Sequence, residues 1–429
     1  MQTHPRAAIV RGLRTPFAKA GTAYARLEAL DLAKIVVTEL LQRSGIDPGT
    51  IDEVVFGTVI PSVKASNLAR EIVLGTGIPP SVPAWSVTRA CATSNQSITS
   101  AADLIFRGWA HTVIAGGAES LSTVPILFSR KFAETLMAAS KAKSVGAKIA
   151  AFSRLRPKDL APDAPAIAES TTGLTMGESA EKMAKENGIT REAQDRFALQ
   201  SHQRAAAAWA SGRFRDEVMT VLVPPKFDAV VEKDNIIRED TTLEALAKLK
   251  PVFDRKYGTI TAGNSSPLTD GASAVLMMSE ERAKSLGIEP IGYIRSYAYA
   301  SLDPFDQLLQ GPVFALPVAL ERAGLKLSDI GVIEMHEAFA AQVLSNIQWM
   351  GSKKIARERL GRSEPIGEID PEAINATGGS IAIGHPFGAT GARIVTSVCH
   401  ELRRTGQQYG LVTVCAAGAQ GSAIVLERE

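Results

Sequence analysis

Hydrophobic positions along the chain alternate between a helical spacing and short β-branched runs. Residues 31–41 and 91–106 carry apolar side chains three and four positions apart, whereas residues 51–56 and 111–115 are short runs rich in Val and Ile. A period of about 3.6 residues predicts an amphipathic helix, and a short apolar run bounded by turn residues predicts a strand. Helices that alternate with such strands predict an α/β fold in which helices cover the sheets.

The same order of elements recurs in the second half of the chain. Residues 313–322 predict a helix and residues 330–335 predict a strand, and Gly45 and Gly324, which follow the two equivalent helices, are 279 positions apart. Residues 389–414 then repeat the next helix and strand. The order of the units predicts two related halves.

A segment rich in Ala, Lys and Arg lies between the halves. Its clearest helical patterns are at residues 179–186 and 191–212. We therefore expect three parts: a first half formed by residues 1–120 and 255–286, an inserted and mainly helical domain of residues 121–254, and a second half of residues 287–429.

Composition narrows the class of protein. With 429 residues, 45% hydrophobic and 21% charged, the chain is long enough for two or three domains with sizeable cores, as in a soluble α/β enzyme. A net charge of +2 argues against a general nucleic-acid binder, and three cysteines provide no disulfide framework. The sequence has neither a signal-peptide pattern nor an apolar run of the roughly 18–20 residues that span a bilayer, so we expect a cytoplasmic protein.

The positive charge is concentrated in residues 126–158. This basic segment holds eight cations against Glu134, a local charge of +7 that leaves −5 for the rest of the chain. The cations are Arg130, Lys131, Lys141, Lys143, Lys148, Arg154, Arg156 and Lys158. Phe128, Phe132, Leu136 and Ala139 recur between them at helical spacing. The pattern predicts either a solvated helix or a surface that contacts membrane lipid or a partner protein.

Four segments carry candidate chemistry. Cys91 stands before a predicted helix, where exposed amides and the helix dipole favour a thiolate. His336, His385 and Cys415 lie far downstream in turns, the last two rich in glycine. Such a set suits a nucleophile with a base, an acid and oxyanion donors. A zinc site is the alternative, but the spacing lacks a local Cys-x-x-Cys pair.

These segments resemble the thiolases, and the resemblance covers nearly the whole chain. Its motifs are the nucleophile segment at Cys91, the Gly-His-Pro-x-Gly-x-Thr-Gly run at His385 and the Cys-x-x-Gly-x-Gln-Gly run at Cys415. The resemblance implies a five-layer α-β-α-β-α core with a loop domain inserted in the first half, and a homodimer or tetramer. Most thiolases have Asn where this chain has His336; the His-Glu-Ala-Phe version is similar to that of the β subunit of the fatty-acid oxidation trifunctional complex.

The resemblance also implies a role for each residue. Cys91 would be the nucleophile that carries the acyl group, and His385 would take its proton and later act as an oxyanion donor. Cys415 would exchange a proton with C2 of the substrate, and His336 would hold an oxyanion-hole water. The backbone amide of Ala417, where many thiolases have glycine, would be a second oxyanion donor beside that of Cys91.

Coenzyme A contacts are expected from the inserted domain and the loop that follows it. The resemblance places Met176 and Ser266 against the pantetheine and Arg238 near the adenine, although Thr175 replaces a frequent His. It implies CoA as a substrate, with no metal and no tightly bound cofactor.

The resemblance implies a degradative acetyl-CoA C-acyltransferase that cleaves 3-ketoacyl-CoA, docked to a hydratase/dehydrogenase α subunit. In that β subunit the region matching the basic segment is implicated in membrane association. A biosynthetic acetyl-CoA acetyltransferase is the alternative within the same class. Ketoacyl synthases share the fold but lack a second catalytic cysteine, so Cys415 argues against them, and a non-catalytic scaffold would be expected to lose part of the site.

Overall fold

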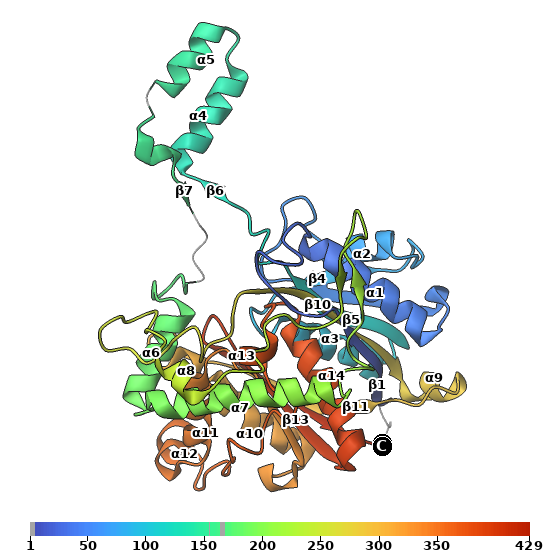
Figure 1. Cartoon of the computed structure of the whole chain (residues 1–429). Coiled ribbons are helices and arrows are strands. Elements are labelled where there is room, and N and C mark those ends of the chain that lie inside the picture. The colour runs from blue at the N-terminus through green and yellow to red at the C-terminus, as the bar shows by residue number, and fades with distance from the viewer. Residues whose placement is uncertain (1–4, 154, 164–167) are drawn as a thin grey trace.

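The computed structural model describes residues 5–153, 155–163 and 168–429 (Figure 1). The first half contains β1 (Ala7–Arg14), β2 (Ala18–Lys19), α1 (Ala29–Ser44), β3 (Glu53–Gly57), α2 (Leu68–Gly75), β4 (Ala84–Val87), α3 (Thr93–Phe106) and β5 (Thr112–Glu119), and it is completed by β10 (Thr269–Ser279) and α9 (Glu280–Ser285). The helix expected over residues 91–106 begins two residues later, at Thr93.

The second half repeats this plan. It contains β11 (Gly292–Ser301), α10 (Gly311–Ala323), β12 (Val332–Met335), α11 (Ala340–Met350), α12 (Lys353–Arg359), α13 (Ser380–Ile383), α14 (Thr390–Thr405), β13 (Tyr409–Ala416) and β14 (Gln420–Glu427). Gly45 and Gly324 end α1 and α10 in the same left-handed conformation, with φ of 65° and 72°. The predicted correspondence of these helix ends is therefore present in the backbone.

Strand pairing joins the halves edge to edge. The order is β12-β13-β14-β11-β1-β10-β5-β3-β4, with β2 beside β10. The halves meet where β1 pairs with β11 through Ala8 and Ile9. β3, β4 and β5 are parallel to one another, as are β12 and β13, so crossover helices must cover the strands.

Alternation along the strands produces the five layers. On β13, Leu411 faces α10 and α11, whereas Val412 and Val414 face α14. On β10, Leu276 packs with α1 and α2, whereas Val275 packs with α3. Since successive strand side chains point to opposite faces, α3 and α14 form a central layer between the strands of the two halves. The predicted α-β-α-β-α core is confirmed.

The inserted segment divides into a projecting hairpin and a part that packs on the body. It contains β6 (Leu127–Phe128), α4 (Arg130–Lys141), α5 (Val145–Phe152), β7 (Pro162–Asp163), α6 (Met176–Glu186), α7 (Arg191–Ala210), β8 (Val221–Leu222), β9 (Val230–Val231) and α8 (Leu243–Ala247). Buried side chains of α6 and α7 belong to clusters shared with α10, α11 and α13. This packing brings the segment that begins at Met176 to the second half.

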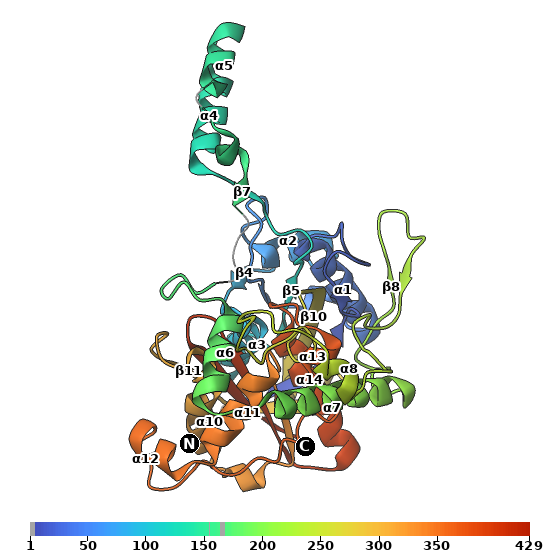
Figure 2. The same ribbon diagram turned by 60° about the vertical axis from the view of Figure 1, so that its left-hand side comes forward.

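Helices α4 and α5 stand away from the body at the end of the β6–β7 ribbon (Figures 1 and 2). Large apolar side chains are exposed on this hairpin, namely Phe128, Leu136, Met137, Val145, Ile149 and Phe152. Arg130 pairs with Glu134 and Lys131 with Asp159. Arg154, one of the eight cations of the basic segment, lies outside the described residues. No described helix has both the length and the hydropathy needed to span a bilayer.

Candidate active site

A tight turn between β4 and α3 presents Cys91. Ala90 adopts a left-handed backbone with φ of 44°, which costs an L-residue roughly 1–2 kcal/mol. The Thr93 hydroxyl holds this turn by donating to the Ala90 carbonyl at 2.7 Å and accepting from the Arg89 amide at 2.8 Å. The guanidinium of Arg89 lies 4.1 Å from the centre of the Tyr299 ring. The turn therefore holds the thiol in one place.

The thiol of Cys91 is not activated in the way that its position before a helix suggests. Burial raises the pKa of Cys91 to about 12, and the backbone amides of Ala417 and of Cys91 itself, hydrogen-bonded to the sulfur, lower it only in part. The backbone amides favour the thiolate as expected, but desolvation outweighs them, so the net shift of the Cys91 pKa is upward. Cys91 needs a base that removes its proton when substrate is in place.

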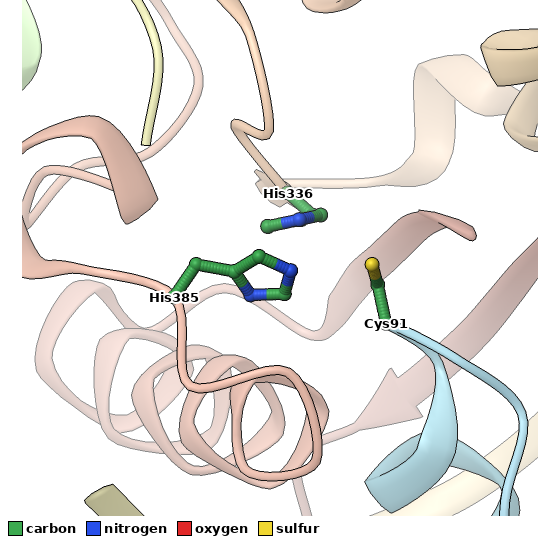
Figure 3. A group of neighbouring side chains, drawn as sticks. All are labelled: Cys91, His336 and His385. Atoms are coloured by element: carbon green, nitrogen blue, oxygen red, sulfur yellow. The ribbon is translucent and has the colours of Figure 1, made fainter. Parts of the chain in front are cut away.

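Two histidines face this thiol (Figure 3). The ligand atoms of Cys91, His336 and His385 lie within 4.8 Å of one another, and the two imidazole ring centres are 4.1 Å apart. His336 follows β12, and His385 lies in the loop between α13 and α14. Among the described residues, neither Nε2 atom has a hydrogen-bond partner. Both rings therefore offer a free nitrogen next to the thiol.

Both histidines are neutral. Burial lowers the pKa of His385 to about 3, with a further contribution from the Arg393 guanidinium. Burial also places the pKa of His336 well below 6.5, and His385 and Arg393 lower it further. A neutral imidazole has one lone pair and one N–H, so it can act as a base or as a hydrogen-bond donor. This is the chemistry that a protonated Cys91 requires.

Cys415 completes the group at the end of β13. Its side chain is buried, and burial followed by the proximity of Cys91 keeps its pKa well above 9. A protonated thiol beside the nucleophile can donate a proton to a carbanion. The Ala417 amide, two residues later, already lies at the Cys91 sulfur. The structure thus brings Cys91, His336, His385, Cys415 and Ala417 together.

The residues expected to contact CoA lie around the reacting side chains rather than among them. Met176 opens α6 and packs beside the apolar cluster that contains Cys415. The Ser266 hydroxyl donates to the Ala338 carbonyl at 3.2 Å, two residues after His336. Arg238 is exposed, and its backbone amide donates to His202 Nδ1 at 3.2 Å. Met176 and Ser266 are therefore close to the reacting groups, whereas the Arg238 side chain faces solvent.

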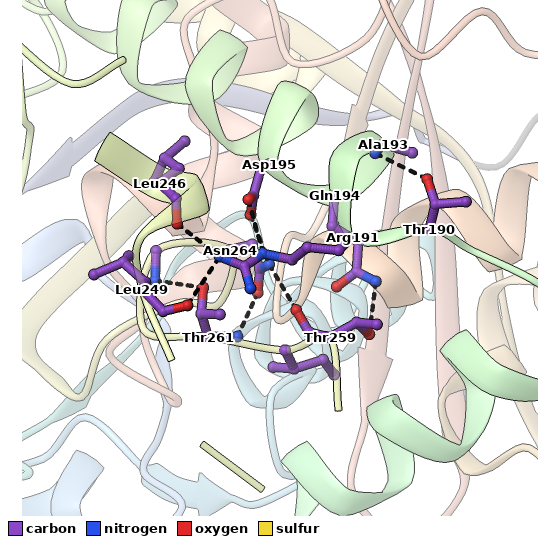
Figure 4. A network of polar contacts seen from close by, with 12 residues as sticks. Thr190, Arg191, Ala193, Gln194, Asp195, Leu246, Leu249, Thr259, Thr261 and Asn264 are labelled. Atoms are coloured by element: carbon purple, nitrogen blue, oxygen red, sulfur yellow. Dashed lines mark hydrogen bonds and ion pairs between the residues drawn. The ribbon is translucent and has the colours of Figure 1, made fainter. Parts of the chain in front are cut away.

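A polar network fixes the loop that carries Ser266 (Figure 4). Asn264 Nδ2 donates to Asp195 at 2.9 Å, and Asn264 Oδ1 accepts from the Thr261 amide at 2.8 Å. Arg191 holds Asp195 through an ion pair of 2.7 Å. Helix α7 thereby anchors the loop against the second half, where the Ala340 amide donates to the Asn264 carbonyl.

The Cys-His-His set could also hold a metal ion by its donor types. The backbone amides of Ala417 and Cys91 at the sulfur are donors, however, and suit a developing oxyanion rather than a cation. The arrangement therefore favours acyl chemistry, and the absence of a metal from the site stays a prediction.

Comparisons with known proteins agree with this chemistry. Residues 7–281 match the model of the thiolase N-terminal domain, and residues 288–428 match that of the thiolase C-terminal domain. The chain belongs to the thiolase family. It is 54% and 55% identical over 424 residues to the 3-ketoacyl-CoA thiolases of Yersinia enterocolitica and Yersinia pestis, covering 99% of this chain and 97% of each relative.

Solved thiolase structures share the fold over the full length. The acetyl-CoA acetyltransferase of Bacillus anthracis is 32% identical with a TM-score of 0.85, and the alignment covers 100% of both chains. Human mitochondrial 3-ketoacyl-CoA thiolase is 32% identical with a TM-score of 0.82, over 99% of both chains.

Sequence reasoning missed a buried carboxylate that braces the site of this thiolase. Glu119, at the end of β5, accepts from the Thr58 hydroxyl at 2.9 Å, from the amides of the next two residues at 3.0 and 3.1 Å, and from the Gly388 amide at 3.0 Å. Gly388 belongs to the loop that carries His385. An acid at the end of a buried strand gives no motif, so only the contacts identify it.

We expect Glu119→Gln to destabilise the thiolase by about 3 kcal/mol, because an amide N–H would then oppose backbone N–H donors in a buried site. Thiolase activity should also fall, because the loop that carries His385 loses the hydrogen bond that anchors it to Glu119. Urea unfolding monitored by circular dichroism measures the first effect, and the exposed Glu281→Gln is the matched control. An unchanged free energy of unfolding would remove Glu119 from this role.

Proposed function

We propose that this chain is a 3-ketoacyl-CoA thiolase (acetyl-CoA C-acyltransferase) of fatty-acid β-oxidation. The observation that carries the proposal is the cluster of Cys91 with His385, His336 and Cys415, in which the Ala417 amide meets the nucleophilic sulfur. Relatives named 3-ketoacyl-CoA thiolase at 54–55% identity support the degradative role over the biosynthetic one.

In the first half-reaction, His385 Nε2 takes the proton of Cys91 and the thiolate attacks C3 of the 3-ketoacyl-CoA. The amides of Cys91 and Ala417 stabilise the tetrahedral oxygen at C3. Cleavage of the C2–C3 bond leaves an acyl thioester on Cys91. Cys415 donates its proton to C2 of the enolate, and acetyl-CoA departs.

In the second half-reaction, the Cys415 thiolate takes the proton of an incoming CoA thiol. The CoA thiolate attacks the acyl group on Cys91, and a shortened acyl-CoA leaves. The Cys91 thiolate regains its proton from His385, so every group returns to its starting state. CoA is a substrate in this scheme, held by Met176, Ser266 and Arg238.

Biosynthetic condensation of two acetyl-CoA molecules is the second candidate. The likeness to the acetyl-CoA acetyltransferase of Bacillus anthracis supports it, at a lower identity of 32%. The two roles differ in substrate length rather than in the reacting groups. A series of 3-ketoacyl-CoA substrates in a thiolysis assay separates them.

We place the protein in the cytoplasm as a homodimer or tetramer. The hairpin of α4 and α5 is a separate surface that is available for an intermolecular contact. Exposed apolar side chains beside cations suit an anionic lipid interface. Among the described residues, Lys141, Lys143 and Lys148 form no ion pair. We propose that the hairpin contacts anionic membrane, and that docking to a hydratase/dehydrogenase α subunit is a separate contact to be tested beside it.

Cys91→Ala is expected to abolish both thiolysis and condensation, because no other side chain can carry the acyl group. Mass spectrometry of the unmodified protein after brief exposure to acyl-CoA should show the adduct on Cys91. An adduct on Cys415 or Cys399 would contradict the assignment.

Cys415→Ser should separate the two kinds of chemistry. Transfer of an acyl group from acyl-CoA to Cys91 needs no carbanion and should persist, whereas deuterium exchange at C2 of acetyl-CoA should be lost. Exchange at the normal rate would assign the acid and base role to another residue.

Replacing Lys141, Lys143 and Lys148 by Gln should weaken binding to vesicles that contain anionic lipid. Each lysine near such a surface contributes roughly 1 kcal/mol, so the triple change is expected to reduce binding on the order of 100-fold. Co-sedimentation measures it, and Lys226, Lys326 and Lys354, exposed on the body, give the matched triple control. Soluble substrates should turn over normally in both variants.

If lipid binding is unchanged in the hairpin variant, the membrane contact is wrong. Pull-down of the α subunit with the wild-type protein tests the separate contact, and both variants should bind that subunit as the wild type does. High salt should mimic the hairpin change in the lipid assay, because the Debye length falls to about 3 Å at 1 M.

A further inference from the structure

The two active-site histidines are held by different hydrogen-bond chains. His385 Nδ1 lies 2.6 Å from Thr390 Oγ1, and His336 Nδ1 lies 3.0 Å from Ser380 Oγ. Both hydroxyls are fully buried. Each hydroxyl has a single proton, so its other partner decides whether it donates to the imidazole or accepts from it.

The Thr390 hydroxyl is committed as a donor elsewhere. It donates to the Pro386 carbonyl at 3.1 Å, and a carbonyl oxygen can only accept. With its proton on that carbonyl, the Thr390 oxygen accepts the proton carried by His385 Nδ1. The Nε2 atom of His385 is then an unprotonated base that faces Cys91.

The Ser380 hydroxyl has the opposite hydrogen-bonding role, because its other partner is a donor. Arg393 Nη2 donates to Ser380 Oγ at 3.1 Å, and a guanidinium can only donate. The hydroxyl proton of Ser380 is therefore free to be donated to His336 Nδ1. If His336 carried its proton on Nδ1 instead, the Ser380 proton would lack an acceptor among the described residues, at a cost of about 1–3 kcal/mol.

We propose that Ser380, oriented by Arg393, is a positioning residue that fixes His336 as the Nε2–H tautomer, so that the two histidines face the substrate in opposite forms. His385 presents a lone pair and removes the Cys91 proton. His336 presents an N–H and donates, directly or through a water, to the oxygen on which the enolate charge develops. This inference rests on the proposed thiolase reaction for its purpose, but not for its geometry.

The opposite assignment would work against the reaction. A lone pair on His336 Nε2 would face the developing negative charge and repel it. Burial lowers the pKa of His336, so protonation of that ring does not supply the missing donor. The Ser380–Arg393 pair therefore keeps His336 as an N–H donor. A side-chain amide in the place of His336 would be such a donor permanently.

Nitrogen-15 NMR of protein labelled at histidine tests the tautomers directly. The wild-type spectrum should show His336 protonated at Nε2 and His385 protonated at Nδ1, with signals assigned by loss in His336→Asn and His385→Asn. Ser380→Ala should turn the His336 signal into a mixture of tautomers. A wild-type His336 protonated at Nδ1 would overturn the proposal, whatever the enzyme's substrate.

Kinetics provide the functional test. Ser380→Ala should lower kcat for thiolysis on the order of 10- to 100-fold, up to the loss seen when one oxyanion donor is removed, while KM changes little. Ser380→Thr keeps the hydroxyl and should restore much of kcat. Ser345→Ala, at a buried serine whose hydroxyl has no partner in the described structure, is the matched control for packing.

The outcomes separate this proposal from the proposed function. If the wild-type protein fails to cleave any 3-ketoacyl-CoA, the function is wrong, and the NMR result still decides the tautomer. If the wild-type protein is active and Ser380→Ala keeps full kcat, Ser380 does not position His336. Equal losses in Ser380→Ala and Ser380→Thr would also contradict the role of the hydroxyl.

Discussion

Desolvation at the junction of the two halves is the constraint on which the active site depends. It raises the pKa of both active-site thiols and lowers that of both histidines, so all four groups are uncharged before substrate arrives. A thiolate already present in the resting enzyme would be stable and would have little driving force to attack the substrate. A neutral thiol beside a neutral imidazole can instead exchange its proton at the moment of attack.

Arg393 is a buried charged group beside these neutral side chains. It is almost fully buried in α14, and its Nη1 atom lies 3.7 Å from Glu334. Burial raises the pKa of Glu334 to about 8, although Arg393 opposes that shift. A buried pair of this kind adds little net stability. Its value lies in orientation, because the same guanidinium reaches Ser380 and thereby His336.

The order of helices and strands was predictable because it depends on local periodicity, and the internal repeat at Gly45 and Gly324 was visible without the structure. The grouping of Cys91, His336 and His385 followed from the family motifs rather than from periodicity. The protonation state of Cys91 was not predictable, because burial depends on how the halves pack. Ser380 and Glu119 were missed for the same reason: neither lies in a recognisable motif, and each acts through a contact between distant segments.

Glycines show how closely those segments must approach. A Cβ on Gly379, just before Ser380, would collide with the Glu337 carboxyl, and a Cβ on Gly117 would collide with the Gly388 backbone. The Glu337 carboxylate in turn accepts from Ser201 on α7 at 2.7 Å and from Asn375 at 2.6 Å. A side chain at Gly379 would push apart the segments that carry His336 and His385, and one at Gly117 would push the His385 loop away from β5. Glycine at these two positions is thus a steric condition for bringing one neutral base and one neutral donor to the same sulfur.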